Sequence, residues 1–126
     1  MFRLYVWMDG EGFDPVRFRE AYGGEVSSRR RISDGLVKSA GQYWQSAELS
    51  GVPAARVEDE LRGLLRRLEP ALKTVSDAQG MRIVIEVVQE YRDSDSVAGL
   101  FLSAETLRII AGMRASVDLD IVRDLS

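Results

Sequence analysis

The feature that most constrains the fold is the regular alternation of side chains along residues 81–90. Apolar side chains occupy every second position there, at Met81, Ile83, Ile85 and Val87. A period of two is typical of a β-strand with one face on a core. Residues 2–8 and 115–121 show the same alternation. Because several such strands must cover their apolar faces, we expect helices with one apolar stripe to pack against a common sheet.

The longest of these helices is expected from residue 57 onwards. Its apolar residues recur at helical spacing, at Val57, Leu61, Leu64, Leu65 and Leu68. We expect a kink or break at Pro70, because proline lacks a backbone N–H. A first helix is expected to begin at Asp14-Pro15 and end at Gly23-Gly24, and a third to begin after the cap Ser103.

The remaining strands are expected at residues 25–28, 42–49 and 97–102. The order β-α-β-β-α-β-β-α-β follows, and its first six elements are ferredoxin-like. The sequence therefore predicts an α+β fold, a two-layer α/β sandwich. Its ferredoxin-like β-α-β-β-α-β core is extended by a C-terminal β-α-β unit, with about six strands and three helices in all. We expect a single domain over residues 1–126, with the structure and role of residues 25–41 left largely unassigned.

Composition excludes several kinds of chemistry. The 126 residues include no Cys and no His, so thiolate metal sites, Fe–S clusters and histidine-dependent triads are excluded. There are 17 Lys and Arg residues against 20 Asp and Glu, which gives a net charge of −3 and argues against nucleic acid as a partner. No apolar run is long enough for a bilayer, and the first residues resemble no signal peptide. We expect a cytoplasmic protein without a membrane partner.

The candidate partner-binding surface is the sheet face opposite the core. Alternation places Tyr5 and Trp7 on this face, and we expect Trp44 or Tyr43 beside them, with Trp44 taken as the site residue. The same rule brings in the acidic residues Glu86, Glu90, Asp118 and Asp120. Trp and Tyr are common interface anchors, whereas the acids would repel phosphate. A basic protein partner fits this surface, and packing of the aromatic residues under a loop is the structural alternative.

Three further sets of residues are candidate sites. Arg29, Arg30 and Arg31 could contact an anion or a partner, or form a solvated loop. Asp118 and Asp120 lie about 7 Å apart on one strand face and could act as acid and base, or could protect a sheet edge. Asp9, Glu11 and Asp14 could ligate a hard cation or form an acid/base pair, but they fit a structural turn in which Asp14 caps the following helix. We expect no catalytic residue, no metal and no cofactor.

Several short motifs, taken in order, resemble a known family. They are Asp9-Gly10, Asp14-Pro15, Tyr43-Trp44, the leucine stripe of residues 61–68, the strand 83–87, the segment 100–105 and the strand 115–120. Together they resemble the bacterial family known as domain of unknown function 4279. The resemblance covers nearly the whole chain except residues 25–41. It implies a fold but no accepted activity, and it suggests a role as an immunity or interaction protein in bacterial conflict systems.

These observations lead to one functional hypothesis with two alternatives. We expect a non-catalytic protein-binding domain, most specifically an immunity-type protein that neutralises a basic toxin domain by occlusion. In that mechanism the acids steer the partner while Tyr5 and Trp7 anchor it. The alternatives are a small-molecule or nucleotide-binding regulatory domain that uses Arg29–Arg31, and a carboxylate-dependent hydrolase. Open sheet edges also allow a homodimer.

Overall fold

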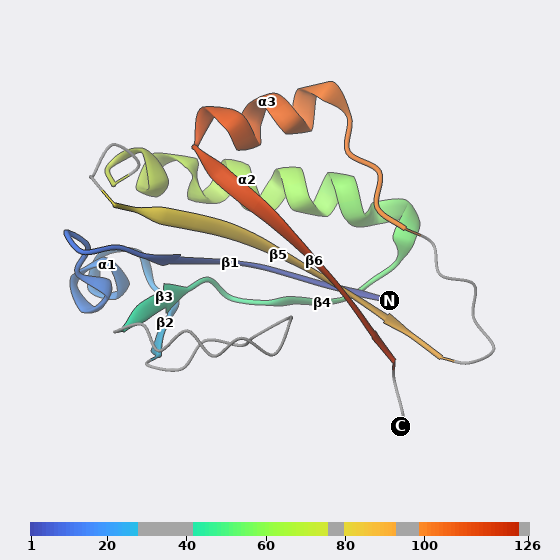
Figure 1. The fold of residues 1–126 in the computed structure, drawn as a ribbon, viewed down its shortest axis with the longest axis horizontal. Coiled ribbons are helices and arrows are strands. Elements are labelled where there is room, and N and C mark those ends of the chain that lie inside the picture. Colours follow the sequence, from blue (N-terminus) through green and yellow to red (C-terminus); the bar gives the residue numbers. More distant parts are fainter. Residues whose placement is uncertain (28–41, 76–79, 93–98, 124–126) are drawn as a thin grey trace.

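A computed structural model of the chain describes residues 1–27, 42–75, 80–92 and 99–123, and shows one mixed sheet with helices on one side (Figure 1). The strands lie in the order β2-β3-β1-β5-β6, and β4 also pairs with β1. All neighbouring pairs are antiparallel except β5 and β6, which are parallel. The strands are β1 (Phe2–Asp9), β2 (Glu25–Ser27), β3 (Tyr43–Gln45), β4 (Leu49–Val52), β5 (Arg82–Tyr91) and β6 (Ala115–Arg123).

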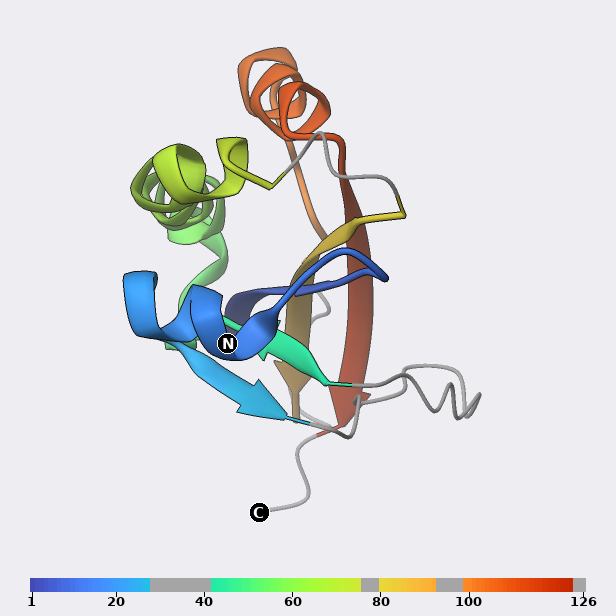
Figure 2. The ribbon, with the colours of Figure 1, turned by 90° about the vertical axis from the view of Figure 1, so that its left-hand side faces the viewer.

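Three α-helices complete the described fold. They are α1 (Pro15–Tyr22), α2 (Val57–Lys73) and α3 (Ala104–Gly112), and the short 3-10 turn η1 (Ala54–Arg56) precedes α2. Figure 2 shows α2 and α3 on the same side of the sheet. The two-layer α/β sandwich of six strands and three helices is thereby confirmed. No helix in the described ranges is long and apolar enough to cross a membrane.

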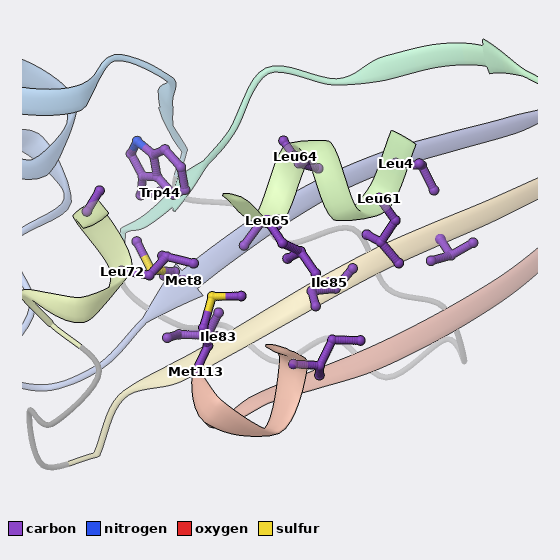
Figure 3. Close-up of a cluster of buried hydrophobic side chains, with 14 of the residues drawn as sticks. Leu4, Met8, Trp44, Leu61, Leu64, Leu65, Leu72, Ile83, Ile85 and Met113 are labelled. Carbon is purple, nitrogen blue, oxygen red and sulfur yellow. The ribbon is translucent and has the colours of Figure 1, made fainter. Parts of the chain in front are cut away.

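The core lies between α2 and the inner face of the central strands. Leu61 and Leu65 of α2 are fully buried in one cluster with Ile85 of β5. Figure 3 shows these side chains, with Trp44, Met8 and Leu72 in the same cluster. Burial of large apolar side chains is the main stabilising term in such a layer. Alternate residues of β1 and β5 enter this core, and the residues between them lie on the outer face of the sheet.

The chain folds the first helix as its caps predict. Asp14 accepts a hydrogen bond from the backbone N–H of Arg17 at 3.1 Å, and Pro15 occupies the first turn. The rings of Phe13 and Phe18 pack with centroids 5.5 Å apart across this N-terminus. An N-terminal cap and a hydrophobic staple therefore fix the start of α1.

The strand expected at residues 42–49 is interrupted and extends further than predicted. Its two parts, β3 and β4, pair with successive stretches of β1. Between them Ser46 keeps contact with β1, because its N–H donates to the Val6 carbonyl at 2.8 Å and its Oγ accepts from the Val6 N–H at 2.9 Å. The hydroxyl thus replaces a backbone acceptor where the register slips by one residue. Counted as one interrupted strand, β3 and β4 preserve the predicted order of the first six elements.

Two other element predictions were wrong. The helix α2 continues through Pro70 to Lys73, so the break expected there does not occur. Pro70 removes one hydrogen bond of the helix, and its side chain is exposed. The strand expected at residues 97–102 is absent over the described residues 99–102. The chain there leads directly into α3, where Ser103 accepts from the Thr106 N–H. Because β6 then lies parallel to β5, the C-terminal unit is a helical crossover, as parallel neighbours require.

A close backbone approach fixes the end of α1 against β3. Trp44 Nε1 donates to the Gly23 carbonyl at 2.7 Å, and Gly24 has a φ of +84°. A Cβ built on Gly24 would lie 2.5 Å from Trp44 Nε1 and 2.6 Å from the Gln45 carbonyl oxygen. Only glycine fits both the backbone angle and the space.

We predict that Gly24→Ala destabilises the fold by about 3 kcal/mol or more, from left-handed strain together with overpacking. Gly51→Ala is the matched control, because Gly51 has a φ of +64° but nothing within 4 Å of an added Cβ. The control should cost only about 1–2 kcal/mol. Urea unfolding followed by tryptophan fluorescence measures both. Equal losses in the two variants would contradict the close contact at Trp44.

Candidate functional site

The candidate site lies on the sheet face that the core does not use. Tyr5 of β1 pairs in register with Glu86 of β5, which in turn pairs with Asp118 of β6. The three side chains therefore form one row across the sheet, because paired residues share a face. Trp7 and Asp120 lie two positions away from this row on their own strands. Strand register alone brings these residues together from opposite ends of the chain.

Aromatic side chains enclose Glu86 on one side. Trp7 donates from Nε1 to Glu86 Oε1 at 2.9 Å. Its ring packs edge-on against Tyr43, with centroids 6.2 Å apart, while Tyr5 and Glu86 are each only 5% exposed. The carboxyl group is therefore largely withdrawn from water, and it accepts a hydrogen bond from the indole N–H.

Two aspartates lie on the other side of Glu86. One carboxylate oxygen from each of Glu86, Asp118 and Asp120 can be chosen so that all three lie within 4.8 Å of one another. The second oxygen of Glu86, Oε2, is buried and has no hydrogen-bond partner among the described residues. Three acids this close either share protons or hold a cation, since adjacent bare carboxylates repel each other.

Burial raises the pKa of Glu86 from an ordinary 4.5 to about 7. The hydrogen bond from Trp7 favours the charged form and acts in the opposite direction. Hydrogen bonding with Asp118, and the negative charges of Asp118 and Asp120, add to the upward shift. Around neutral pH this carboxyl group therefore exists in both protonated and ionised forms.

The arginines on this face are held by other acids. Arg82 donates to both oxygens of Asp9, at 2.9 and 2.7 Å, and lies over the Trp7 ring at 5.5 Å. These hydrogen bonds hold the pKa of Arg82 above its ordinary value. Arg3 forms ion pairs with Glu48 at 3.0 Å and with Glu90 at 2.9 Å. Glu90 thus belongs to a separate ion-pair network at the other end of the face.

The placement of Trp44 on the outer face was wrong. Trp44 pairs with Met8, so it points into the core, where it is 1% exposed and packs against Phe18 at 4.8 Å. Its neighbour Tyr43 takes the place beside Trp7 instead. Alternation within Tyr43–Gln45 requires the two aromatic residues to face opposite sides, but which one faces the core depends on the register with β1.

The burial of the predicted surface also differs from expectation. Tyr5 and Glu86 are buried, so neither presents a side chain to a partner in this structure. Trp7, Glu90, Asp118 and Asp120 are partly buried. Arg29, Arg30 and Arg31, the expected anion contacts, lie outside the described residues. Trp7, Glu90 and the two acids of β6 therefore remain the accessible part of the predicted surface.

The alternative acid pair, Asp9 and Glu11, lines a surface hollow of about 500 Å³ at the end of β1. Phe13, Pro15 and Arg82 also line this hollow. Both oxygens of Asp9 accept hydrogen bonds from Arg82. Because the arginine holds Asp9 as an ion pair, this geometry does not favour Asp9 and Glu11 as an acid/base couple.

Comparison with known proteins identifies the family. A family model described as a domain of unknown function, DUF4279, matches residues 20–123. The chain belongs to this family. The match includes β5, β6 and all three clustered acids of this DUF4279 domain, but not β1, which contributes Trp7. No curated protein and no solved structure matches the chain.

The pKa of Glu86 predicts how the stability of this DUF4279 domain depends on pH. Folded Glu86 keeps its proton to about pH 7, whereas the unfolded residue loses it near pH 4.5. Between these two pH values the unfolded state binds fewer protons than the folded state. The contribution of the Glu86 proton to the free energy of unfolding is therefore complete below pH 4.5 and is lost as the pH rises to about 7. The expected loss is on the order of 3 kcal/mol.

Glu86→Gln should remove this loss, because an amide keeps the shape of the side chain but does not ionise. Urea unfolding between pH 4 and 8, in buffer with a chelator, measures the difference between the variant and the native chain. Glu90→Gln is the control, since it lies on the same face but outside the three-acid cluster. If the free energies of unfolding of the native chain and of Glu86→Gln change in parallel with pH, the prediction is contradicted, because Glu86 is then already ionised in the folded protein.

Proposed function

We propose that this chain is a non-catalytic protein-binding domain that accepts an extended protein segment along the outer edge of β6. The observation that carries the proposal is the position of β6 in the sheet. It is a nine-residue strand at one end of the strand order, and among the described residues it pairs only with β5. A long edge strand offers backbone donors and acceptors for the addition of another strand.

The side chains of β6 define the chemistry of the partner. On the helix side, Leu119 is 39% exposed and Ile121 is 52% exposed. On the outer face the strand carries Asp118 and Asp120. An added strand matches this edge when apolar residues alternate with basic ones. Its apolar residues then lie beside Leu119 and Ile121, and its basic residues lie beside Asp118 and Asp120. The partner we propose is a segment of that kind.

A second copy of the same chain is disfavoured by charge. In a two-fold antiparallel pair of β6 strands, each outer row would lie opposite its own copy. Asp118 and Asp120 would then face aspartates, and like charges directly opposite each other are destabilising. The same two residues attract lysine or arginine. They therefore protect the edge against self-association while admitting a basic segment.

The biological role that we propose is neutralisation of a basic toxin domain by occlusion. The net charge of −3 supports electrostatic steering towards such a partner. The family description assigns no activity. The nucleotide-binding alternative depends on Arg29–Arg31, which lie outside the described residues.

We predict that a synthetic peptide of alternating Lys and Val residues binds along β6. Amide chemical shifts of Ala115–Arg123 should change and their hydrogen exchange should slow, and binding should weaken as salt increases. A peptide of alternating Glu and Val residues is the matched control and should not bind. The proposal fails if the amide changes lie away from β6, if both peptides bind equally or if neither binds.

Side-chain variants test the same edge. Leu119→Lys and Ile121→Lys should each weaken peptide binding by at least tenfold, because they place a cation opposite the apolar residues of the peptide. Phe101→Ser is the control, since Phe101 is 78% exposed but lies beside the start of α2. All three positions are exposed, so we expect the variants to fold. Size-exclusion chromatography of the native chain would contradict the charge argument if it showed a dimer that Ile121→Lys abolishes.

A further inference from the structure

The carboxylates of Glu86, Asp118 and Asp120 form a cluster on two adjacent strands. Their oxygens lie within 4.8 Å of one another. Ligand oxygens on opposite sides of an ion at about 2.1–2.4 Å lie about 4–5 Å apart. Adjacent ligands of one ion lie closer, about 3 Å apart, so a spacing within 4.8 Å is compatible with one ion shared by the three residues. The strand register supplies this spacing, because Glu86 and Asp118 are paired neighbours and Asp120 follows on the same face.

A second observation points to a ligand at this cluster. Glu86 is only 5% exposed, and its Oε2 atom has no hydrogen-bond partner among the described residues. The other oxygen is held by Trp7 Nε1, which fixes the orientation of the carboxyl group. A buried polar atom without a partner is costly in a folded protein and calls for an explanation. The hydrogen-bonding contact between Glu86 and Asp118 brings the two carboxyl groups together, so that a proton or a cation can lie between them.

We propose that Glu86, Asp118 and Asp120 together bind a hard divalent cation such as Mg²⁺, Mn²⁺ or Ca²⁺. The three ligands are all carboxylate oxygens, which suit these ions. The chain contains no His or Cys, so softer metals would find no nitrogen or thiolate ligand here. Asp118 and Asp120 are partly exposed, so water can complete the coordination and the ion can exchange.

Two arginines of the outer face pair with acids outside the cluster. Arg3 pairs with Glu48 and Glu90, and Arg82 pairs with Asp9. Glu86 is buried beside Tyr5, and Trp7 holds its Oε1, so its carboxyl group is fixed next to the two aspartates. This site shares Asp118 and Asp120 with the proposed partner edge, but it does not use the backbone or the apolar row of β6.

The indole N–H resonances of the native chain provide the first test. Trp7 donates to a proposed ligand, whereas Trp44 donates to the Gly23 carbonyl, away from the cluster. Addition of Mg²⁺ should shift the Trp7 indole signal until it saturates and leave the Trp44 signal in place. A Trp7 signal that does not move up to roughly 10 mM Mg²⁺, above the weakest natural calcium sites, would overturn the proposal in favour of a shared proton.

Binding of Mn²⁺, measured by the loss of the free-ion electron paramagnetic resonance signal, provides the second test. We expect one ion per chain, with at least tenfold weaker binding in Glu86→Gln and in Asp118→Asn. Glu90→Gln is the control and should bind as the native chain does, because Glu90 pairs with Arg3 outside the cluster. Circular dichroism checks that each variant folds. Native-like Mn²⁺ binding by folded Glu86→Gln and Asp118→Asn would place the ion elsewhere and overturn the proposal, whatever the outcome of the peptide experiments.

Discussion

The pairing of β1 with β5 is the interaction on which the rest of the structure depends. The two strands are in register along the whole of β1, from Phe2 opposite Gln89 to Asp9 opposite Arg82. One set of alternate residues forms the core beneath α2, and the other set forms the outer face. A slip of one residue would exchange the two faces. The core and the acidic cluster are therefore fixed by the same register.

The sequence predicts those parts of the fold that follow from local patterns. The alternation at residues 81–90, the leucine stripe from residue 57 and the cap at Asp14 all appear as expected. The departures come from longer-range effects. The break between β3 and β4 depends on the Ser46 hydroxyl meeting Val6 of a distant strand. The path after β5 depends on α3 crossing to a parallel β6, and neither contact leaves a local sequence signal.

The candidate site was predictable only as far as it follows from the alternation of side chains along each strand. Alternation within β5 and β6 places Glu86, Asp118 and Asp120 on one face. The close approach of these residues and the burial of Glu86 require the pairing of β5 with β6 and the position of Trp7. Trp44 was expected on the outer face beside Tyr5 and Trp7, but its register with Met8 places it in the core. Alternation along a strand predicts which residues share a face, and the pairing of the strands decides which face is buried.

The two proposals share Asp118 and Asp120, and this overlap has a thermodynamic consequence. A bound divalent cation would neutralise most of the charge of the cluster and so reduce its attraction for lysine or arginine beside β6. The backbone edge and the apolar row with Leu119 and Ile121 would remain available. A basic segment and a cation would therefore weaken each other's binding by the same factor, because coupling between two sites is reciprocal. Such a coupling would make partner affinity depend on the concentration of free divalent ions while the fold itself stays unchanged.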